Sequence, residues 1–263
     1  MLATLTIDGP IATLTLNRPE QRNALSLDLL AALHKRVDEL APTAPTGSAA
    51  GGSSGPPTTG RPTVLIVTGA GKAFCAGMDL KQVLGDDALA RKLLLSLADF
   101  TLKLRALPLV TLAVVNGAAI GGGCGLSTVC DLSITHADSK MGFPEVDLGV
   151  CPAVVAPWLV RKVGAGRARA ILLRGGVMSG AAAHAAGMVS EVVPTLADLA
   201  PAAQQMAARL ATGGPVALAA TKALMNELDG SLDRALLHRA ANLSADVLGT
   251  AEAQAMLKTK LGS

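Results

Sequence analysis

Apolar and polar residues alternate at the start of the chain, which is the pattern of half-buried strands. The alternation runs to Ile7, the turn residues Asp8-Gly9-Pro10 follow, and a second run extends from Ile11 to Leu16. The sequence therefore predicts a β-hairpin. Further on, Ser26 is a good N-cap, and apolar residues at helical spacing predict a helix over residues 27–40.

Strands and helices alternate through the next part of the chain. Apolar runs predict strands over 63–68, 109–115 and 131–136, and a long helix is predicted over 87–107. This alternation is typical of an α/β core.

Beyond residue 153 the pattern is mostly helical. Only residues 189–193 are strand-like, and helices are predicted over 153–163, 166–174, 180–186, 197–211, 214–228, 231–248 and 250–260. We therefore expect a core formed by residues 1–194, followed by a C-terminal helical region, 195–263, that packs against the core or another subunit.

Residues 41–62 differ from the rest of the chain. They read APTAPTGSAAGGSSGPPTTGRP, a tract of small and polar residues that cannot bury apolar area. A domain linker could have this composition, but the segment before the tract is too short to form its own core. The tract is therefore predicted to be a disordered insertion within one domain.

Composition excludes several classes of protein. Of the 263 residues, 50% are hydrophobic and 16% are charged, which excludes an intrinsically disordered chain. A net charge of +3 with three Phe, one Trp and no Tyr argues against nucleic-acid binding. The N-terminus shows no signal or transit pattern, and the four cysteines form no CxxC pair. We expect reduced, mostly buried thiols in a cytoplasmic protein.

A stretch without charges, residues 106–130, is long enough to span a bilayer. It contains Pro108, Asn116 and five glycines from Gly117 to Gly125, which favour turns. A buried strand, a sharp turn and a short buried helix explain it better, so no membrane span is predicted.

Two glycine-rich passages each follow an apolar strand and are the strongest candidates for chemistry. They read AFCAGMDLK from Ala73 and NGAAIGGGCGL from Asn116, and the second leads into a helix. Glycines let backbone N–H groups face a ligand, and a helix N-terminus adds a positive dipole end. Two such turns side by side would form an oxyanion hole. The four histidines are scattered, and no cluster has metal-ligand spacing, so no metal site is predicted.

These passages, together with FPEVDLGVCPAVVAPWL and the early RPEQRNAL, resemble the crotonase, or enoyl-CoA hydratase/isomerase, superfamily. The resemblance covers essentially the whole chain apart from residues 41–62. It implies a crotonase-like fold, an α/β spiral of ββα units followed by a C-terminal helical region.

The resemblance also implies the site residues. In the family, two peptide N–H groups bind the thioester carbonyl, and matching the motifs places them at Met78 and Gly122. Backbone around Ala24 and Ala76 would hold the adenine end of coenzyme A. A further set would line the pantetheine path: Asp79, Leu80 and Lys81, with Lys81 near phosphate.

The catalytic carboxylates are where this chain departs from the family pattern. Two-glutamate hydratases have one Glu two residues after the GGG triplet and a second in the later Pro-Glu segment. Here the first position is Gly125, and the second survives as Glu145. A lone carboxylate is compatible with a hydratase, a Δ3,Δ2-enoyl-CoA isomerase or another thioester reaction, and also with a low-activity subunit kept for assembly or CoA binding.

The resemblance implies an enzyme that hydrates a 2-enoyl-CoA in fatty acid metabolism, with Glu145 handling protons. The string around Glu145 looks like methylglutaconyl-CoA hydratase-like and geranyl-type carboxy-enoyl-CoA hydratases, whose substrates are branched or carboxylated. In that reading the space at Gly125 is used by a bulky or carboxylated acyl group, or by water that this group helps to position. Coenzyme A belongs to the substrate, so no separate cofactor is implied. The expected assembly is a homotrimer or a dimer of trimers.

Overall fold

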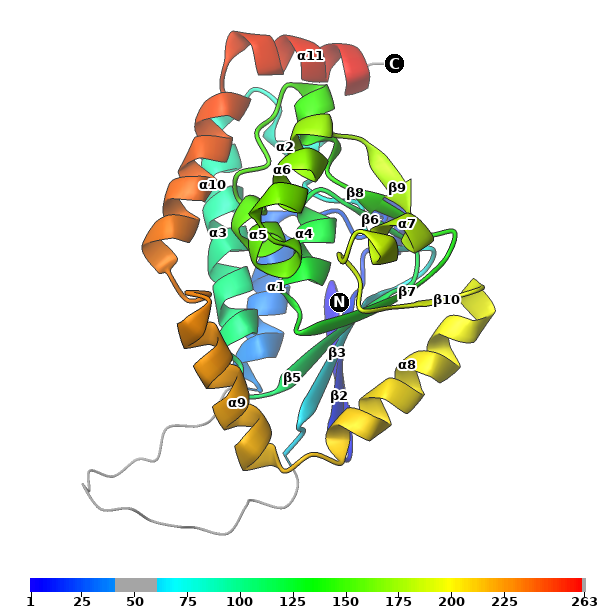
Figure 1. The fold of residues 1–263 in the computed structure, drawn as a ribbon. Helices are drawn as coiled ribbons and strands as arrows, with labels where there is room; N and C mark the ends of the chain where they lie inside the picture. The colour runs from blue at the N-terminus through cyan, green and yellow to red at the C-terminus, as the bar shows by residue number, and fades with distance from the viewer. Residues whose placement is uncertain (41–60, 262–263) are drawn as a thin grey trace, which may run out of the picture.

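The computed structural model describes residues 1–40 and 61–261, which form two sheets surrounded by helices (Figure 1). The predicted hairpin is confirmed: β1 (Ala3–Asp8) and β2 (Ile11–Leu16) pair antiparallel, with Leu5 opposite Leu14. Most of the predicted insertion, residues 41–60, lies outside the described residues.

From β3 to β8, consecutive strands alternate between the two sheets. The larger sheet has the order β1-β2-β3-β5-β7-β10, and the smaller has the order β4-β6-β8-β9. The larger sheet's remaining strands are β3 (Val64–Gly69), β5 (Val110–Val115), β7 (Leu132–His136) and β10 (Glu191–Val193). The smaller sheet consists of β4 (Ala73–Cys75), β6 (Ala118–Ile120), β8 (Lys140–Gly142) and β9 (Val177–Ser179). Pairs such as β3 then β4 and β5 then β6, each followed by helix, form the predicted spiral of ββα units.

The helices agree with the sequence pattern at most positions. The core helices are α1 (Leu27–Asp38), α2 (Leu80–Val83), α3 (Asp87–Ala106), α4 (Gly122–Val129), α5 (Ala156–Val163), α6 (Ala165–Arg174) and α7 (Gly180–Ala185). Two 3-10 turns, η1 (Pro19–Gln21) and η2 (Pro144–Leu148), complete the core. As predicted, Ser26 caps α1 by accepting a hydrogen bond from the Leu29 N–H. The helix expected from residue 153 begins only at Ala156, with Pro157 in its first turn, where proline is tolerated.

The C-terminal region is helical, as predicted, and packs against the core of its own chain. It consists of α8 (Leu196–Ala211), α9 (Pro215–Leu228), α10 (Arg234–Leu248) and α11 (Ala251–Leu261). Helix α8 covers the outer face of the larger sheet, where Leu199 and Met206 pack on Ile66 and Leu112. Helix α10 runs along α3 (Figure 1). The opposite face of the central strands carries Leu65, Val67 and Ala113, which belong to the main core. Both faces are therefore covered, which explains why these strands are mostly apolar.

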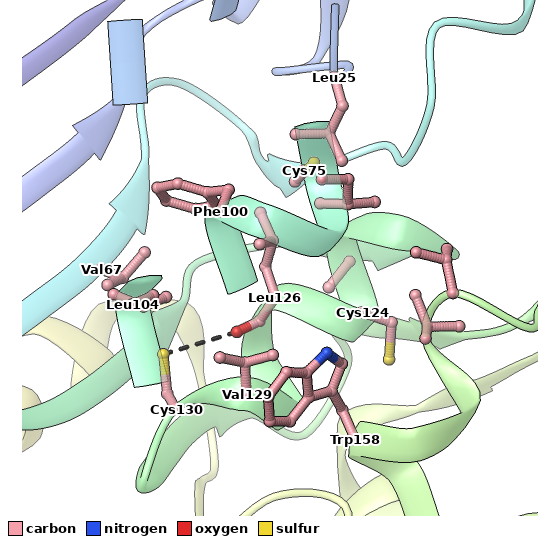
Figure 2. Close-up of a cluster of buried hydrophobic side chains, with 14 of the residues drawn as sticks. Leu25, Val67, Cys75, Phe100, Leu104, Cys124, Leu126, Val129, Cys130 and Trp158 are labelled. Carbon is pink, nitrogen blue, oxygen red and sulfur yellow. Dashed lines mark hydrogen bonds between the residues drawn. The ribbon is translucent and has the colours of Figure 1, made fainter. Parts of the chain in front are cut away.

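The uncharged stretch 106–130 folds as predicted into a buried strand, a turn and a short helix. It forms β5, β6 and α4, and all of the side chains of β5 are buried. Around α4 a dense cluster of apolar side chains includes Phe100, Leu126 and Trp158 (Figure 2). Across residues 1–40 and 61–261, none of the helices has both the length and the apolarity needed to cross a membrane.

Candidate active site

The turns that follow β4 and β6 lie against each other. Leu25 and Met78 form an isolated parallel bridge, in which the Leu25 N–H donates to Gly77 O at 2.7 Å and the Asp79 N–H donates to Leu25 O at 2.9 Å. Gly77 has φ +87°, and a Cβ there would lie only 2.6 Å from Ile120 O. Glycine at position 77 therefore allows both a left-handed turn and close contact of the two backbones.

Two backbone N–H groups are left facing the space beside these turns. The bridge between Leu25 and Met78 uses the backbone groups of Gly77 and Asp79, so it leaves the Met78 N–H free. Gly122 is the first residue of α4, where an N–H has no acceptor within the helix. Neither N–H has a hydrogen-bond partner within the described ranges. A Cβ on Gly122 would lie 4.0 Å from the Met78 nitrogen, so the two groups are close together. With the positive end of the α4 dipole, they are suited to stabilise a developing oxyanion.

A cavity of about 100 Å³ opens beside these two N–H groups. Its walls are built by the two glycine turns, by Leu94 and Leu97 of α3, and by the segment 144–154. Polar side chains contribute little to the lining: Glu145, Cys151 and Ser244. The cavity is thus an apolar chamber with one carboxyl group, which is the kind of environment that holds a reactive group away from bulk water.

The Glu145 carboxyl group lies against the glycine turn before α4. A Cβ on Gly121 would lie 2.8 Å from Glu145 Oε1, and Gly121 has φ +53°, so only glycine fits at this position. Glu145 Oε2 is buried and has no hydrogen-bond partner in the described part of the chain. Burial raises the pKa of Glu145 to about 7. Near neutral pH this carboxyl can therefore both accept and donate a proton.

The raised pKa predicts a pH-dependent stability. Glu145 has a pKa of about 7 in the folded chain and an ordinary value of 4.5, so its ionisation destabilises the fold as pH rises through 7. This cost reaches about 3 kcal/mol above pH 8. We expect the free energy of unfolding of Glu145→Gln, minus that of wild type, to increase from pH 4.5 to pH 8. Denaturant titrations across this range measure it, and a constant difference would contradict the burial of the carboxyl.

The structure brings five of the sequence-predicted residues together and places four outside the cavity. Ala76, Met78, Leu80, Gly122 and Glu145 all line it. The four that do not line it are Ala24, Asp79, Lys81 and Gly125. Lys81 is exposed, on the short helix α2 that follows Met78. Ala24 and Asp79 belong to the structure that supports the turn.

Arg18 links the RPEQRNAL segment to the turn around Met78. Its guanidinium forms an ion pair with Asp79 at 2.8 Å and donates to Ala24 O at 3.1 Å. The buried Asn23 side chain donates to the carbonyls of Ala70, Ala73 and Phe74, the last two in β4. The sequence alone did not identify Arg18 and Asn23 as residues that fix this turn. The RPEQRNAL motif contains both residues and was the one signal in the sequence that could have pointed to them.

Gly125 requires a correction. The expectation that an acyl group uses the space at this position is wrong, because the Val155 side chain occupies it. A Cβ on Gly125 would lie 2.4 Å from Val155 Cγ1, and neither Gly125 nor Val155 lines the cavity. The side chain that substitutes for the missing carboxylate is therefore a valine from the start of α5.

This contact predicts that Gly125→Ala destabilises the protein by about 1–3 kcal/mol, through overpacking against Val155. Val155→Ala removes the methyl group that is nearest to the new Cβ, so the double variant should recover part of the loss. Thermal unfolding of the two single variants and the double variant measures this coupling. Additive effects would contradict the proposed contact.

The four cysteines lie mostly in the core. Cys75, Cys124 and Cys130 are buried free thiols, as predicted, and Cys151 is partly exposed. Within residues 1–40 and 61–261, no group of three or more His, Cys, Asp or Glu side chains is arranged to hold a metal ion.

Among the lining residues that were not predicted from sequence, three come from helices far from the motifs. Leu94 and Leu97 lie on α3, and Ser244 lies on α10. The Ser244 hydroxyl donates to Cys151 O at 2.8 Å and accepts from the Val154 N–H at 3.1 Å, so α10 holds the segment beyond Glu145. The residues around Ser244 in the sequence do not indicate that its side chain lies at this cavity.

Comparisons with known proteins give a match to one protein family over most of the chain. Residues 59–259 match the family model described as enoyl-CoA hydratase/isomerase. The chain is 34% identical over 218 residues to the 2,3-dehydroadipyl-CoA hydratase of Escherichia coli, which covers 82% of this chain and 78% of that protein.

Solved structures extend the similarity to the whole fold. An enoyl-CoA hydratase from Mycobacterium avium superposes with a TM-score of 0.82 at 26% identity, covering 99% of this chain and 96% of the other. An enoyl-CoA hydratase from Bacillus anthracis gives a TM-score of 0.76 at 27% identity, covering 94% and 91%. These matches confirm the predicted α/β fold class with its C-terminal helical region.

Proposed function

Because the chain belongs to the enoyl-CoA hydratase/isomerase family, we propose that it adds water reversibly across the 2,3-double bond of an enoyl-CoA thioester. The observation that carries this proposal is the position of one carboxyl, Glu145, in an apolar cavity beside two unpartnered N–H groups. Acid–base and oxyanion groups are thus available to the same reacting atoms.

In the proposed reaction the thioester oxygen accepts hydrogen bonds from the N–H groups of Met78 and Gly122. The Glu145 carboxylate removes a proton from water as the water oxygen bonds to C3, and the electrons of the double bond move to the thioester as an enolate. The protonated Glu145 then delivers that proton to C2, which completes the addition and regenerates the carboxylate. The two N–H groups stabilise the enolate, and one such donor is worth on the order of 3 kcal/mol.

A single carboxyl can serve both steps because its pKa of about 7 is close to the working pH. The proton moves from water to Glu145 and on to C2, so no second acid is needed. This accounts for the presence of glycine at position 125, the first acid position in two-glutamate hydratases. The proposal calls for no cofactor beyond the coenzyme A of the substrate.

The lining of the cavity supports an uncharged acyl group. No Lys, Arg or His is among the described residues that line it, so nothing there would pair with a substrate carboxylate. An unpaired carboxylate next to Glu145 would be costly in an apolar chamber. We therefore propose short linear or branched acyl groups, in place of the carboxylated substrates that the sequence also suggested.

A substrate panel tests this preference. We expect kcat/KM for crotonyl-CoA to exceed that for 2,3-dehydroadipyl-CoA by at least about tenfold, because the latter carries a free carboxylate and loses about 1.4 kcal/mol or more. Loss of absorbance of the conjugated thioester measures both rates. The relative named for dehydroadipyl-CoA is the matched control enzyme. Equal rates, or a preference for dehydroadipyl-CoA, would contradict the assignment of the apolar cavity to the acyl group.

A Δ3,Δ2-enoyl-CoA isomerase is the second candidate, because one carboxyl can also move a proton between two carbons of an enolate. In that reaction no water oxygen enters the product. The product of hydration therefore contains one oxygen atom from water, and the product of isomerisation does not.

We also propose a homotrimer or a dimer of trimers in the cytoplasm. Helix α9 supports assembly, since Val216, Leu224 and Leu228 are more than half exposed on it. Such a patch is typical of a surface that contacts another subunit.

A further inference from the structure

A second cavity, of about 90 Å³, lies at the C-terminal end of α4 and shares no lining residue with the cavity of Glu145. Its lining is mostly polar. The charged residues that line it are Arg105, Arg161, Lys162, Asp131 and Asp229. Cations therefore exceed carboxylates by one. Two neighbours outside the lining do not change this excess, because Lys222 forms an ion pair with Asp131 at 2.8 Å and Asp233 interacts with Arg161.

Both carboxylates are already occupied by donors. Asp131 accepts hydrogen bonds or ion pairs from Arg105, Lys222 and the N–H and hydroxyl of Thr111. Asp229 accepts from Arg105 and from the N–H and hydroxyl of Ser231. The remaining donors of the cavity cannot all be satisfied by these two groups.

The carbonyl groups at the end of α4 are occupied as well. Arg105 Nη1 donates to Val129 O at 3.3 Å, and Lys162 Nζ donates to Cys130 O and Asp131 O. Arg161 Nε and Nη2 donate to backbone carbonyls after α9. The Cys130 thiol adds no negative charge, because burial raises its pKa to about 12.

Three buried donors remain without a partner in the described part of the chain: Arg105 Nε, Trp158 Nε1 and Arg161 Nη1. Trp158 is only 2% exposed, and its ring lies 5.2 Å below the Arg161 guanidinium carbon. Figure 2 shows its indole in the packed layer beside Val129 of α4. Arg105, Trp158 and Arg161 all line the cavity, and leaving buried donors unpaired is costly, so the cavity is suited to a species that accepts hydrogen bonds.

We propose that this cavity binds a small monovalent inorganic anion of the chloride class. A water molecule would bring two protons of its own, while the two carboxylates of the cavity already accept several hydrogen bonds each, whereas a halide only accepts. An anion would also offset the burial of the cations, which lowers the pKa of Arg161 and of Lys162. The bound anion would join α3, α5 and the turn between α9 and α10.

Bromide is the probe, because its anomalous scattering identifies it in a crystal. Crystals of the full chain grown in sodium bromide should give an anomalous peak between Arg161 and Lys162. In solution, sodium chloride should raise the Tm of wild type by about 3 °C over sodium gluconate of equal ionic strength, when the chloride concentration is about ten times the Kd for chloride.

Two variants and a control separate binding from general stability. Trp158→Phe keeps an aromatic ring and removes the indole N–H, and Arg161→Met removes one cation. Both should lose at least half of the chloride-specific shift whatever their starting Tm. Arg169→Met removes the same charge from an exposed position on α6 and should keep the shift. The absence of a bromide peak, or an equal chloride response in all four proteins, would overturn the proposal.

Discussion

Glu145→Gln is expected to lower kcat for hydration by at least about a hundredfold, with substrate binding little changed. Glutamine preserves the size of the side chain and its contact with the Gly121 turn, but it can neither take a proton from water nor return one to C2. Since Glu145 is the one carboxyl among the described residues that line the cavity, no neighbour can replace it.

The control for this variant lies two residues further along the same turn. Asp147 Oδ2 accepts a hydrogen bond from the Gly176 N–H at 2.7 Å and does not line the cavity. Asp147→Asn removes an equal charge, and its kcat should stay within a few-fold of wild type. Steady-state rates with crotonyl-CoA measure both variants. Near-normal turnover of Glu145→Gln would remove Glu145 from the mechanism.

Gly77→Ala is expected to lower kcat/KM by about a hundredfold or more, through the oxyanion hole. The new Cβ would lie 2.6 Å from Ile120 O, so the two turns must move apart. That movement separates the N–H groups of Met78 and Gly122, and the loss of one donor accounts for the expected effect. The left-handed φ of +87° adds backbone strain of about 1–3 kcal/mol.

Gly164→Ala is the control that separates the effect of backbone strain from the effect of the contact between the two turns. Gly164 has φ +80°, but nothing lies within 4 Å of the position of its Cβ. The variant should lose stability and keep its activity. Thermal unfolding and kcat/KM, measured on both variants, distinguish the two effects. A folded Gly77→Ala protein with normal activity would show that the contact between the turns is not needed.

The fold was predictable where local patterns are strong. The alternation up to Leu16 gave the hairpin, Ser26 marked the start of α1, and the glycines after Asn116 distinguished a strand, turn and short helix from a membrane span. The short strands of the smaller sheet were harder to predict. Three-residue strands such as β9 (Val177–Ser179) carry too little alternation to be recognised, and their pairing depends on the spiral.

Only the residues of the candidate site that stand in sequence motifs could be predicted. Met78, Gly122 and Glu145 stand in motifs, and the structure places all three at one cavity. Val155 and Ser244 show the limit, because each acts on residues that lie far from it in sequence. Val155 fills the space beside Gly125, thirty positions earlier, and Ser244 binds the backbone around Cys151. No rule of sequence spacing connects such pairs, so only the packing in the structure reveals them.

The most direct test of the account is the fate of solvent atoms in one turnover. Wild-type protein and Glu145→Gln are incubated with crotonyl-CoA in D₂¹⁸O, and the products are analysed by mass spectrometry. Hydration through Glu145 predicts one ¹⁸O at C3 and one deuterium at C2 in the wild-type product. In Glu145→Gln the incorporation of both labels should be lost together. A product with a shifted double bond and no ¹⁸O would contradict hydration and identify an isomerase.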